Sequence, residues 1–371
     1  MADHCCIHAL GDPREKDLTT KCSHEHDYVC SSCESLSAVL SIIEEALPTD
    51  TTSCSIAQDE CDDMIFTFQQ AKSSIIAWKA HQLRSIRQDQ SRLDVLHDLK
   101  ENEVLITQDW AMKFLPLRYR ETQANWFGKR GISWHISVAV KKDSDGNLQH
   151  QAFLHIVKHC SQDTSVVVSL LEHTLRCLHN EHPEINTAYL RQDNAGCYHS
   201  AGMVMACHLM EASTGVKIRR VDFSDPQGGK GPCDRKAATV KAHVRRFVNE
   251  GNDVLTAENL RDAVLSNGGV RGVRVTLVDG SKIKPLPPVK WEGVSHLNNF
   301  LYAQTSVTAW KAYKIGRGKK FLWSQLQGTM STILKQKTYH MYECEKFVYV
   351  VYMVCPTPHF DSTLMYTNMS L

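Results

Sequence analysis

The chain has 371 residues, of which 42% are hydrophobic and 22% are charged, with a formal net charge of +1 and 14 cysteines. This composition excludes a disordered chain and supports at least one large folded domain. The longest apolar runs, such as 347–355, are shorter than the roughly 18–20 residues of a membrane span, and the first ten residues lack the apolar stretch of a signal peptide. We expect a nuclear or cytosolic protein that is neither secreted nor membrane-bound, in a reducing compartment.

Residues 1–48 are predicted to form a Cys/His-rich zinc segment followed by a short helix over 36–47. The thiolates and imidazoles of this segment suit tetrahedral Zn²⁺, although their spacing differs from that of a C2H2 finger. We predict a structural zinc-knuckle-like site, and the alternative is a segment that binds no metal. The predicted ligands are Cys22, His24 or His26, Cys30 and Cys33, with His4, Cys5, Cys6 and His8 as spare candidates.

Residues 56–100 are predicted to be helical. From 58 to 100 there is neither Gly nor Pro, and apolar residues recur at spacings of three and four with occasional lapses. The pattern predicts one long amphipathic helix, or two in series, that packs against the domain behind it. A coiled-coil homodimer is the alternative, which the lapses in the heptads disfavour.

From residue 101 to 251 the pattern is that of a mixed α/β domain. Strands are predicted over 103–110, 132–142, 150–160, 186–192 and 216–224, and helices over 162–183, 196–215 and 229–251. The order is β-β-β-α-β-α-β-α. It predicts a mixed five-stranded sheet with helices on both faces, which is the arrangement of a ribonuclease-H-like fold.

Residues 252–371 are predicted to add a helix, a strand around Arg274 and a small basic β-rich C-terminal module. The segments 230–246 and 282–320 each contain many Lys or Arg residues and a single acid. Such segments suit a phosphate backbone, with a solvated surface as the alternative. The predicted DNA-binding residues are Lys230, Arg235, Lys236, Lys241, Arg245, Arg246, Lys311, Lys314, Arg317, Lys319 and Lys320.

Three aspartates fall at positions that this strand order brings together. Asp109 ends the first strand, Asp193 follows the fourth, and Asp234 begins the helix after the fifth. Converging carboxylates repel one another unless divalent cations neutralise them. Two Mg²⁺ or Mn²⁺ ions about 4 Å apart drive in-line phosphoryl displacement without a protein nucleophile.

Each of these acids also has an alternative role. Asp193 is placed to cap the helix that follows it, and Asp109 to be a buried acid at a strand end. Asp225, which precedes Pro226, competes with Asp234 for the third position, although a turn role suits Asp225 better.

The three acids resemble the DDE/D triad of the retroviral-integrase and transposase superfamily. The stretches DWAMKF, WFGKRGISWHISV and RQDNAGCYHS, with the segment 224–251, resemble transposon-derived animal proteins, and the resemblance covers roughly residues 22–320. It implies a ribonuclease-H-like core in which Asp109, Asp193 and Asp234 hold two divalent metals for DNA cleavage and strand transfer. The third acid is Asp, one methylene shorter than the commoner Glu.

The same sequence is also compatible with a second function. A domesticated copy would keep the fold and bind DNA, or act as a zinc-stabilised interaction protein, without catalysis. All three acids are present, which argues against complete decay. A small-molecule α/β enzyme is a third possibility, but the sequence contains no cofactor fingerprint.

Overall fold

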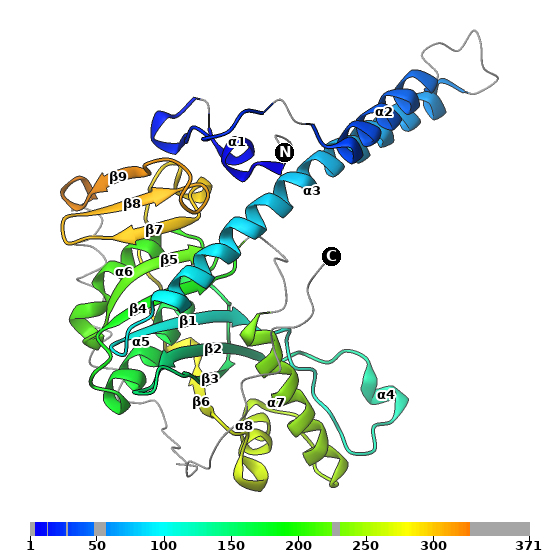
Figure 1. Ribbon diagram of the computed structural model, residues 1–371. Helices are drawn as coiled ribbons and strands as arrows, with labels where there is room; N and C mark the ends of the chain where they lie inside the picture. The colour runs from blue at the N-terminus through cyan, green and yellow to red at the C-terminus, as the bar shows by residue number, and fades with distance from the viewer. Residues whose placement is uncertain (1–3, 13, 27–28, 48–56, 225–230, 327–371) are drawn as a thin grey trace.

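A computed structural model describes residues 4–12, 14–26, 29–47, 57–224 and 231–326. Within these ranges the strands form a nine-stranded mixed sheet in the order β6-β3-β2-β1-β4-β5-β7-β8-β9 (Figure 1). Helices cover both faces of the sheet, and a helical arm extends away from it. The fold is therefore mixed α/β. In the part of the chain that the structure describes, no helix is long and apolar enough to cross a membrane.

The five central strands have the predicted arrangement. Strands β1 (Glu103–Trp110), β2 (Ser133–Lys142) and β3 (Leu148–Lys158) form an antiparallel meander, while β4 (Thr187–Gln192) and β5 (Lys217–Phe223) extend it in parallel from β1. Most of their residues are buried because helices cover both sides. The parallel pairing of β1 with β4 places the C-terminal ends of these two strands next to each other.

The prediction of five strands is wrong, because four more strands continue the sheet at both edges. β6 (Val273–Asp279) pairs in parallel with β3, and β7 (Asn299–Tyr302), β8 (Ser306–Trp310) and β9 (Lys319–Leu322) extend the β5 edge in antiparallel fashion. An open edge would leave backbone N–H and C=O groups unpaired, and these strands satisfy them. The described β-rich C-terminal residues therefore belong to the main sheet.

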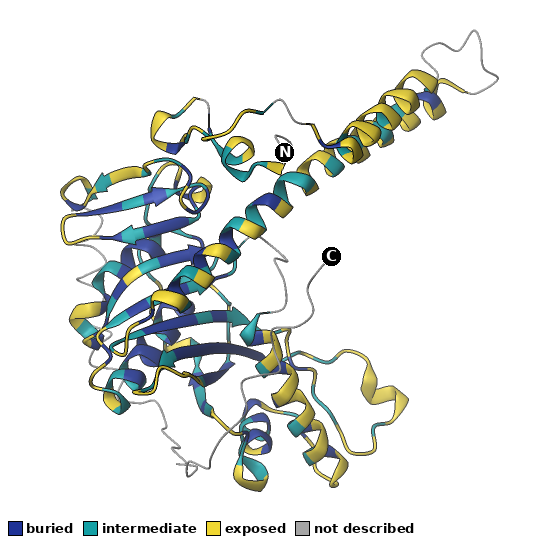
Figure 2. Cartoon of the chain, in the orientation of Figure 1, coloured by how far each residue is buried: buried dark blue, intermediate teal, exposed yellow. Residues whose placement is uncertain are grey.

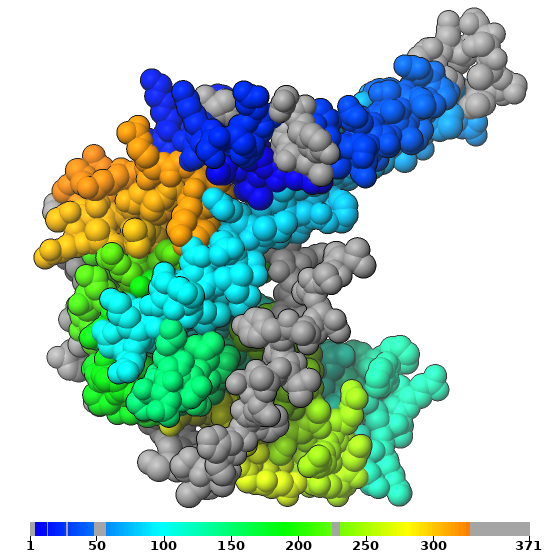
Figure 3. All heavy atoms as spheres, in the orientation of Figure 1, coloured from blue at the N-terminus to red at the C-terminus, as the bar shows by residue number. Residues whose placement is uncertain are grey.

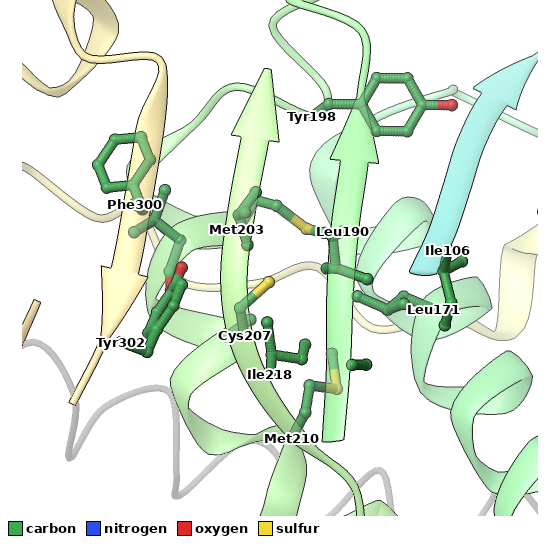
Figure 4. Close-up of a cluster of buried hydrophobic side chains, with 14 of the residues drawn as sticks. Ile106, Leu171, Leu190, Tyr198, Met203, Cys207, Met210, Ile218, Phe300 and Tyr302 are labelled. Carbon is green, nitrogen blue, oxygen red and sulfur yellow. The ribbon is translucent and has the colours of Figure 1, made fainter. Parts of the chain in front are cut away.

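Two pairs of helices cover the two faces of the sheet. Helices α5 (Thr164–Glu181) and α6 (Ala201–Thr214) pack on one face, and α7 (Pro232–Asn249) and α8 (Ala257–Leu265) on the other. Figure 4 shows the core on the first face, where side chains of the helices meet those of the strands. This core includes Ile106, Leu171, Leu190, Met203, Met210, Ile218 and Phe300.

The helices on the first face begin and end at residues whose side chains favour those positions. The side chain of Asp163 accepts a hydrogen bond from the backbone N–H of Val166 at 3.1 Å, which caps α5 as predicted. Ser200 caps α6 in the same way through the N–H of Met203 at 3.2 Å. Gly215 ends α6 with a φ of 74°, a left-handed conformation that glycine adopts without steric cost.

The long helical stretch is one continuous helix, α3 (Gln58–Asp98), which settles the choice between one helix and two. Its C-terminal half packs on the sheet, where Gln88 exchanges hydrogen bonds of 2.9 and 3.0 Å with Asn299 of β7. Its N-terminal half forms the arm with α2 (Ser31–Ala46), and most of the arm is exposed (Figure 2). The coiled-coil homodimer remains a prediction.

Candidate active site

Asp109 and Asp193 lie side by side at the ends of two adjacent parallel strands. Gln108 of β1 is in register with Gln192, the last residue of β4, so Asp109 in β1 and Asp193 directly after β4 are neighbours. Side chains alternate between the two faces of a strand. Leu105 packs in the core under α7 and α8, so Asp109, four residues later, faces the same side.

Asp234 approaches this pair from above, on the first turn of α7. The Sγ of Cys233 lies 3.3 Å from the carbonyl oxygen of Thr107 and 3.6 Å from that of Ile136, which seats the start of α7 over β1 and β2. Asp234 follows directly, and its exposed carboxylate accepts a hydrogen bond of 3.0 Å from the backbone N–H of Gly231. Three elements that are far apart in the sequence thus bring one acid each to the same face.

The electrostatics of Asp109 reflect this convergence. The pKa of Asp109 is raised to about 7, first by burial and then by the negative charges of Asp193 and Asp234, against a hydrogen bond from the backbone of Trp110. A carboxyl group with this pKa is partly protonated at neutral pH. A divalent cation would favour its ionised form, because the cation offsets both the desolvation and the repulsion.

The structure bears on the alternative roles of Asp193 and Asp109 as a helix cap and a buried acid. The alternative role of Asp193 as the cap of the following helix does not hold, because Ser200 caps α6 and Asp193 accepts its 2.7 Å hydrogen bond from Asn194 in the preceding turn. Asp109 is half-buried. Asp225, the alternative third acid, lies outside the described residues.

The carboxylates of Asp109, Asp193 and Asp234 do not all lie within 4.8 Å of one another. Two groups of described residues have candidate ligand atoms that all lie within 4.8 Å of one another, and both consist of Cys and His in the N-terminal segment, not of these acids. A two-metal site spreads its carboxylates around ions about 4 Å apart, so it needs a wider cluster than a single ion does. Carboxylate oxygens are also the ligands that Mg²⁺ and Mn²⁺ prefer.

Buried amide side chains support the strands behind the acids, and the sequence reasoning missed them. Gln192 donates to Gln108 at 2.9 Å, and Gln108 donates to Ser137 of β2 at the same distance. These side chains lie on the face opposite the aspartates and are almost fully buried. The chain of hydrogen bonds joins β2, β1 and β4 immediately before the positions of the two acids, which fixes the strand ends in register.

Three buried histidines continue this polar layer. His135 and His155 are paired across β2 and β3, and His155 lies 2.9 Å from His173 of α5 between ring nitrogens. Burial lowers the pKa of His135 to about 3 and that of His173 to about 4. These imidazoles are therefore neutral and add no positive charge near the acids. The signal in the sequence was a histidine in the middle of each apolar strand, at 135 and 155.

The predicted DNA-binding residues fall into two groups. On α7, Arg235, Lys241, Arg245 and Arg246 are exposed, Lys236 is half-buried, and Lys230 lies outside the described residues. Near the C-terminal strands, several cations form ion pairs with acids of the chain itself. These pairs are Lys311 with Asp12, Lys314 with Asp94, Arg317 with Asp17, and Lys319 with Glu15, whereas Lys320 is simply exposed.

The connection over 111–131, which follows Asp109 and leads into β2, carries a second exposed surface. The side chains of Trp126, in the short helix α4 (Gln123–Trp126), and of Phe127 are 61% and 73% exposed. Lys129 lies over the indole ring of Trp126 at 5.0 Å. A backbone bridge between Leu117 and Val254 holds the connection beside the end of α7. Exposed aromatic rings of this kind are suited to base stacking.

The predicted zinc ligands do not form one cluster. Cys22, His24 and His26 group with Cys5, whereas Cys30 and Cys33 group with His4. Of the spare candidates, the Sγ of Cys6 is directed to the carbonyl oxygen of Leu83, 3.9 Å away. The structure therefore divides the predicted set between two groups of residues.

These observations define a mixed α/β protein with one acid at the C-terminal end of each of two adjacent parallel strands and a third acid on the first turn of helix α7. The chain belongs to the family described as a domain of unknown function (DUF8701), which matches residues 88–285. The match includes the three acids and the strands from β1 to β6, and it excludes the Cys/His segment and β7–β9. No curated protein matches the chain.

Two kinds of solved structure are similar to the chain at low identity. The Mn-soaked nuclease domain of human cytomegalovirus terminase is 14% identical with a TM-score of 0.21, and the alignment covers 42% of this chain and 62% of that domain. The chain thus spans less than two thirds of the terminase domain. The Mos1 transposase paired-end complex with the left transposon end is 12% identical with a TM-score of 0.25, covering 67% and 74% of the two chains.

Proposed function

We propose that the chain is a transposase-derived phosphoryl transferase that cleaves DNA and transfers strands with two Mg²⁺ or Mn²⁺ ions. Asp109, Asp193 and Asp234 are the proposed metal ligands. The observation that carries the proposal is the convergence of these three acids, from β1, the end of β4 and the start of α7, on one face of the sheet. The carboxylate oxygens fit hard divalent cations.

The bound ions would activate the attacking oxygen and stabilise the leaving oxygen. The protein would hold the ligands in place and position the DNA. The buried hydrogen bonds between Gln108, Gln192 and Ser137 hold the strand ends, and the seating of Cys233 holds Asp234. The substrate must approach on the α7 side, because the acids face that side.

A stripe of cations on α7 offers a path for the DNA backbone. At about 100° per residue, Lys241 and Arg245 lie on the same side of the helix as Asp234, whereas Arg246 lies about 120° away. All four residues are exposed. We infer that Lys241 and Arg245 contact phosphates that lead away from the acids.

Cleavage and strand transfer of a labelled DNA duplex in Mn²⁺ test the proposed function. The proposal expects metal-dependent products from the wild type. DNA binding without products in either Mn²⁺ or Mg²⁺ would contradict it and would favour the domesticated, inactive DNA-binding protein.

The cation stripe predicts the salt dependence of DNA binding. Each phosphate contact contributes about 0.9 to the slope of log K against log salt concentration. The double variant Lys241→Gln with Arg245→Gln should therefore reduce the slope by roughly 1–2, as measured by fluorescence anisotropy over a salt series. Arg246→Gln is the matched comparison on the same helix. An equal or larger loss in Arg246→Gln than in the double variant would contradict the proposed path.

Trp126 is predicted to stack on DNA bases. Base stacking on an aromatic side chain contributes about 1–3 kcal/mol, so Trp126→Ala should weaken binding of single-stranded or distorted DNA by roughly 5- to 150-fold. Trp78 of the arm is 62% exposed, and its replacement by Ala is the matched control. Equal affinities of Trp126→Ala and Trp78→Ala would show that Trp126 does not contact the DNA.

A further inference from the structure

The N-terminal segment holds two groups of metal-ligand side chains. Cys5, Cys22, His24 and His26 form the first group, in which one ligand atom of each residue lies within 4.8 Å of all the others. His4, Cys30 and Cys33 form the second group under the same limit. The adjacent residues His4 and Cys5 contribute to different groups. From these groups we infer that the segment binds two zinc ions at separate sites.

The first group has the composition of a closed structural site. Two thiolates and two imidazoles are a complete ligand set for tetrahedral Zn²⁺, and a zinc ion would hold neighbouring ligand atoms about 3.3–3.8 Å apart. The Sγ atoms of Cys5 and Cys22 are 3.3 Å apart, and both cysteines are free thiols. The rings of His24 and His26 are 4.8 Å apart between centroids. The ligand atoms therefore need only small shifts to surround one ion.

The second group supplies three ligands and leaves a fourth position for an exchangeable ligand such as water. The Sγ of Cys33 lies 3.4 Å from Nε2 of His4. It also accepts a hydrogen bond of 3.2 Å from Nζ of Lys79 on α3, which ties the second group to the long helix. A site with three protein ligands should release its ion more readily than the closed site does.

The two ions would stabilise a segment that has little core of its own. Residues 4–26 bury few apolar side chains, with Leu18 at 2% exposure as the main contribution. The segment lies along α3 and against the C-terminal strands (Figure 3). There Asp12 pairs with Lys311, and the backbone of Gly318 donates to that of Asp17 at 2.8 Å. Metal coordination supplies folding energy to small segments of this kind.

The zinc content of the full chain, purified without chelator and measured by mass spectrometry, tests the inference. Wild type should hold about two zinc ions per chain, and Cys22→Ser and Cys33→Ser should hold about one each. Cys6→Ser is the matched control, because Cys6 lies beside the ligands in the sequence but is directed to Leu83. It should retain both ions.

Stepwise removal with a chelator gives a second readout that does not depend on the folding of a variant. Wild type should release its ions in two phases, and the ion of the three-ligand group should leave first. Substitution of Co²⁺ should give the absorption of thiolate-bound tetrahedral metal. Wild type without zinc, a single ion per wild-type chain, or the loss of both ions from either ligand variant would overturn the two-site inference.

Discussion

Asp193→Asn should abolish metal-dependent cleavage while leaving DNA binding intact. Asn keeps the size of the side chain and removes the charge that binds the metal. Loss of a residue that merely supports a metal ligand lowers activity by about 10- to 100-fold, so loss of a proposed ligand itself should lower the rate by more than roughly 100-fold. The rate should be measured on a labelled duplex in Mn²⁺, and the affinity on the same duplex without a divalent metal.

A matched control for Asp193→Asn is Asp143→Asn. Asp143 accepts hydrogen bonds from the backbones of Asp145 and Asn147 in the turn between β2 and β3, away from the acids. The Asp143→Asn variant should therefore cleave DNA as fast as the wild type. Retained cleavage in Asp193→Asn, at a rate close to that of the control, would exclude this acid from the chemistry.

Asp109→Asn should stabilise the protein at pH 8 in a buffer free of Mg²⁺ and Mn²⁺. The folded-state pKa of Asp109 is about 7, whereas an unfolded chain has the usual value of about 4. Between these values the folded state holds a proton that the unfolded state has released, so the free energy of unfolding falls as pH rises through that window. Above pH 7 the wild type has lost this whole contribution to the free energy of unfolding.

The expected gain in the free energy of unfolding of Asp109→Asn follows from the difference between the folded and unfolded pKa of Asp109. Each pKa unit corresponds to about 1.4 kcal/mol, and because Asp109 is only half-buried we expect roughly 2–4 kcal/mol in favour of Asp109→Asn at pH 8. The gain should disappear below about pH 4, where the wild-type carboxyl is protonated in both states. Urea denaturation at the two pH values measures it. A destabilised Asp109→Asn at pH 8 would show that the carboxylate is well satisfied without metal.

The central fold could be predicted because its signals are local. Asp163 and Pro183 bound one helix in the sequence, Gly215 ends another, and alternating apolar residues mark the second and third strands. The order of these elements then limits the topology. The sheet edges could not be predicted in this way. A period of two shows that a run such as 299–302 is extended, but not that it pairs with β5.

The site was predictable for a related reason. Asp109 is one residue from the end of β1 and Asp193 directly follows β4, and the adjacency of those strands follows from the topology. Contacts between residues that are far apart in the sequence could not be predicted. The sequence shows Lys311 and Lys314 as cations, but not that Asp12 and Asp94 pair with them. In the same way, cysteine spacing did not reveal that Cys22 groups with Cys5 and not with Cys33.

Anomalous diffraction from crystals of the zinc-loaded protein soaked in Mn²⁺ tests the central claim most directly. The account predicts two manganese peaks between the carboxylates of Asp109, Asp193 and Asp234, roughly 4 Å apart. It also predicts that both peaks weaken or vanish in Asp193→Asn. Well-ordered carboxylates without manganese between them, at a concentration that saturates other two-metal enzymes, would contradict the claim that these three acids form a metal-dependent catalytic centre.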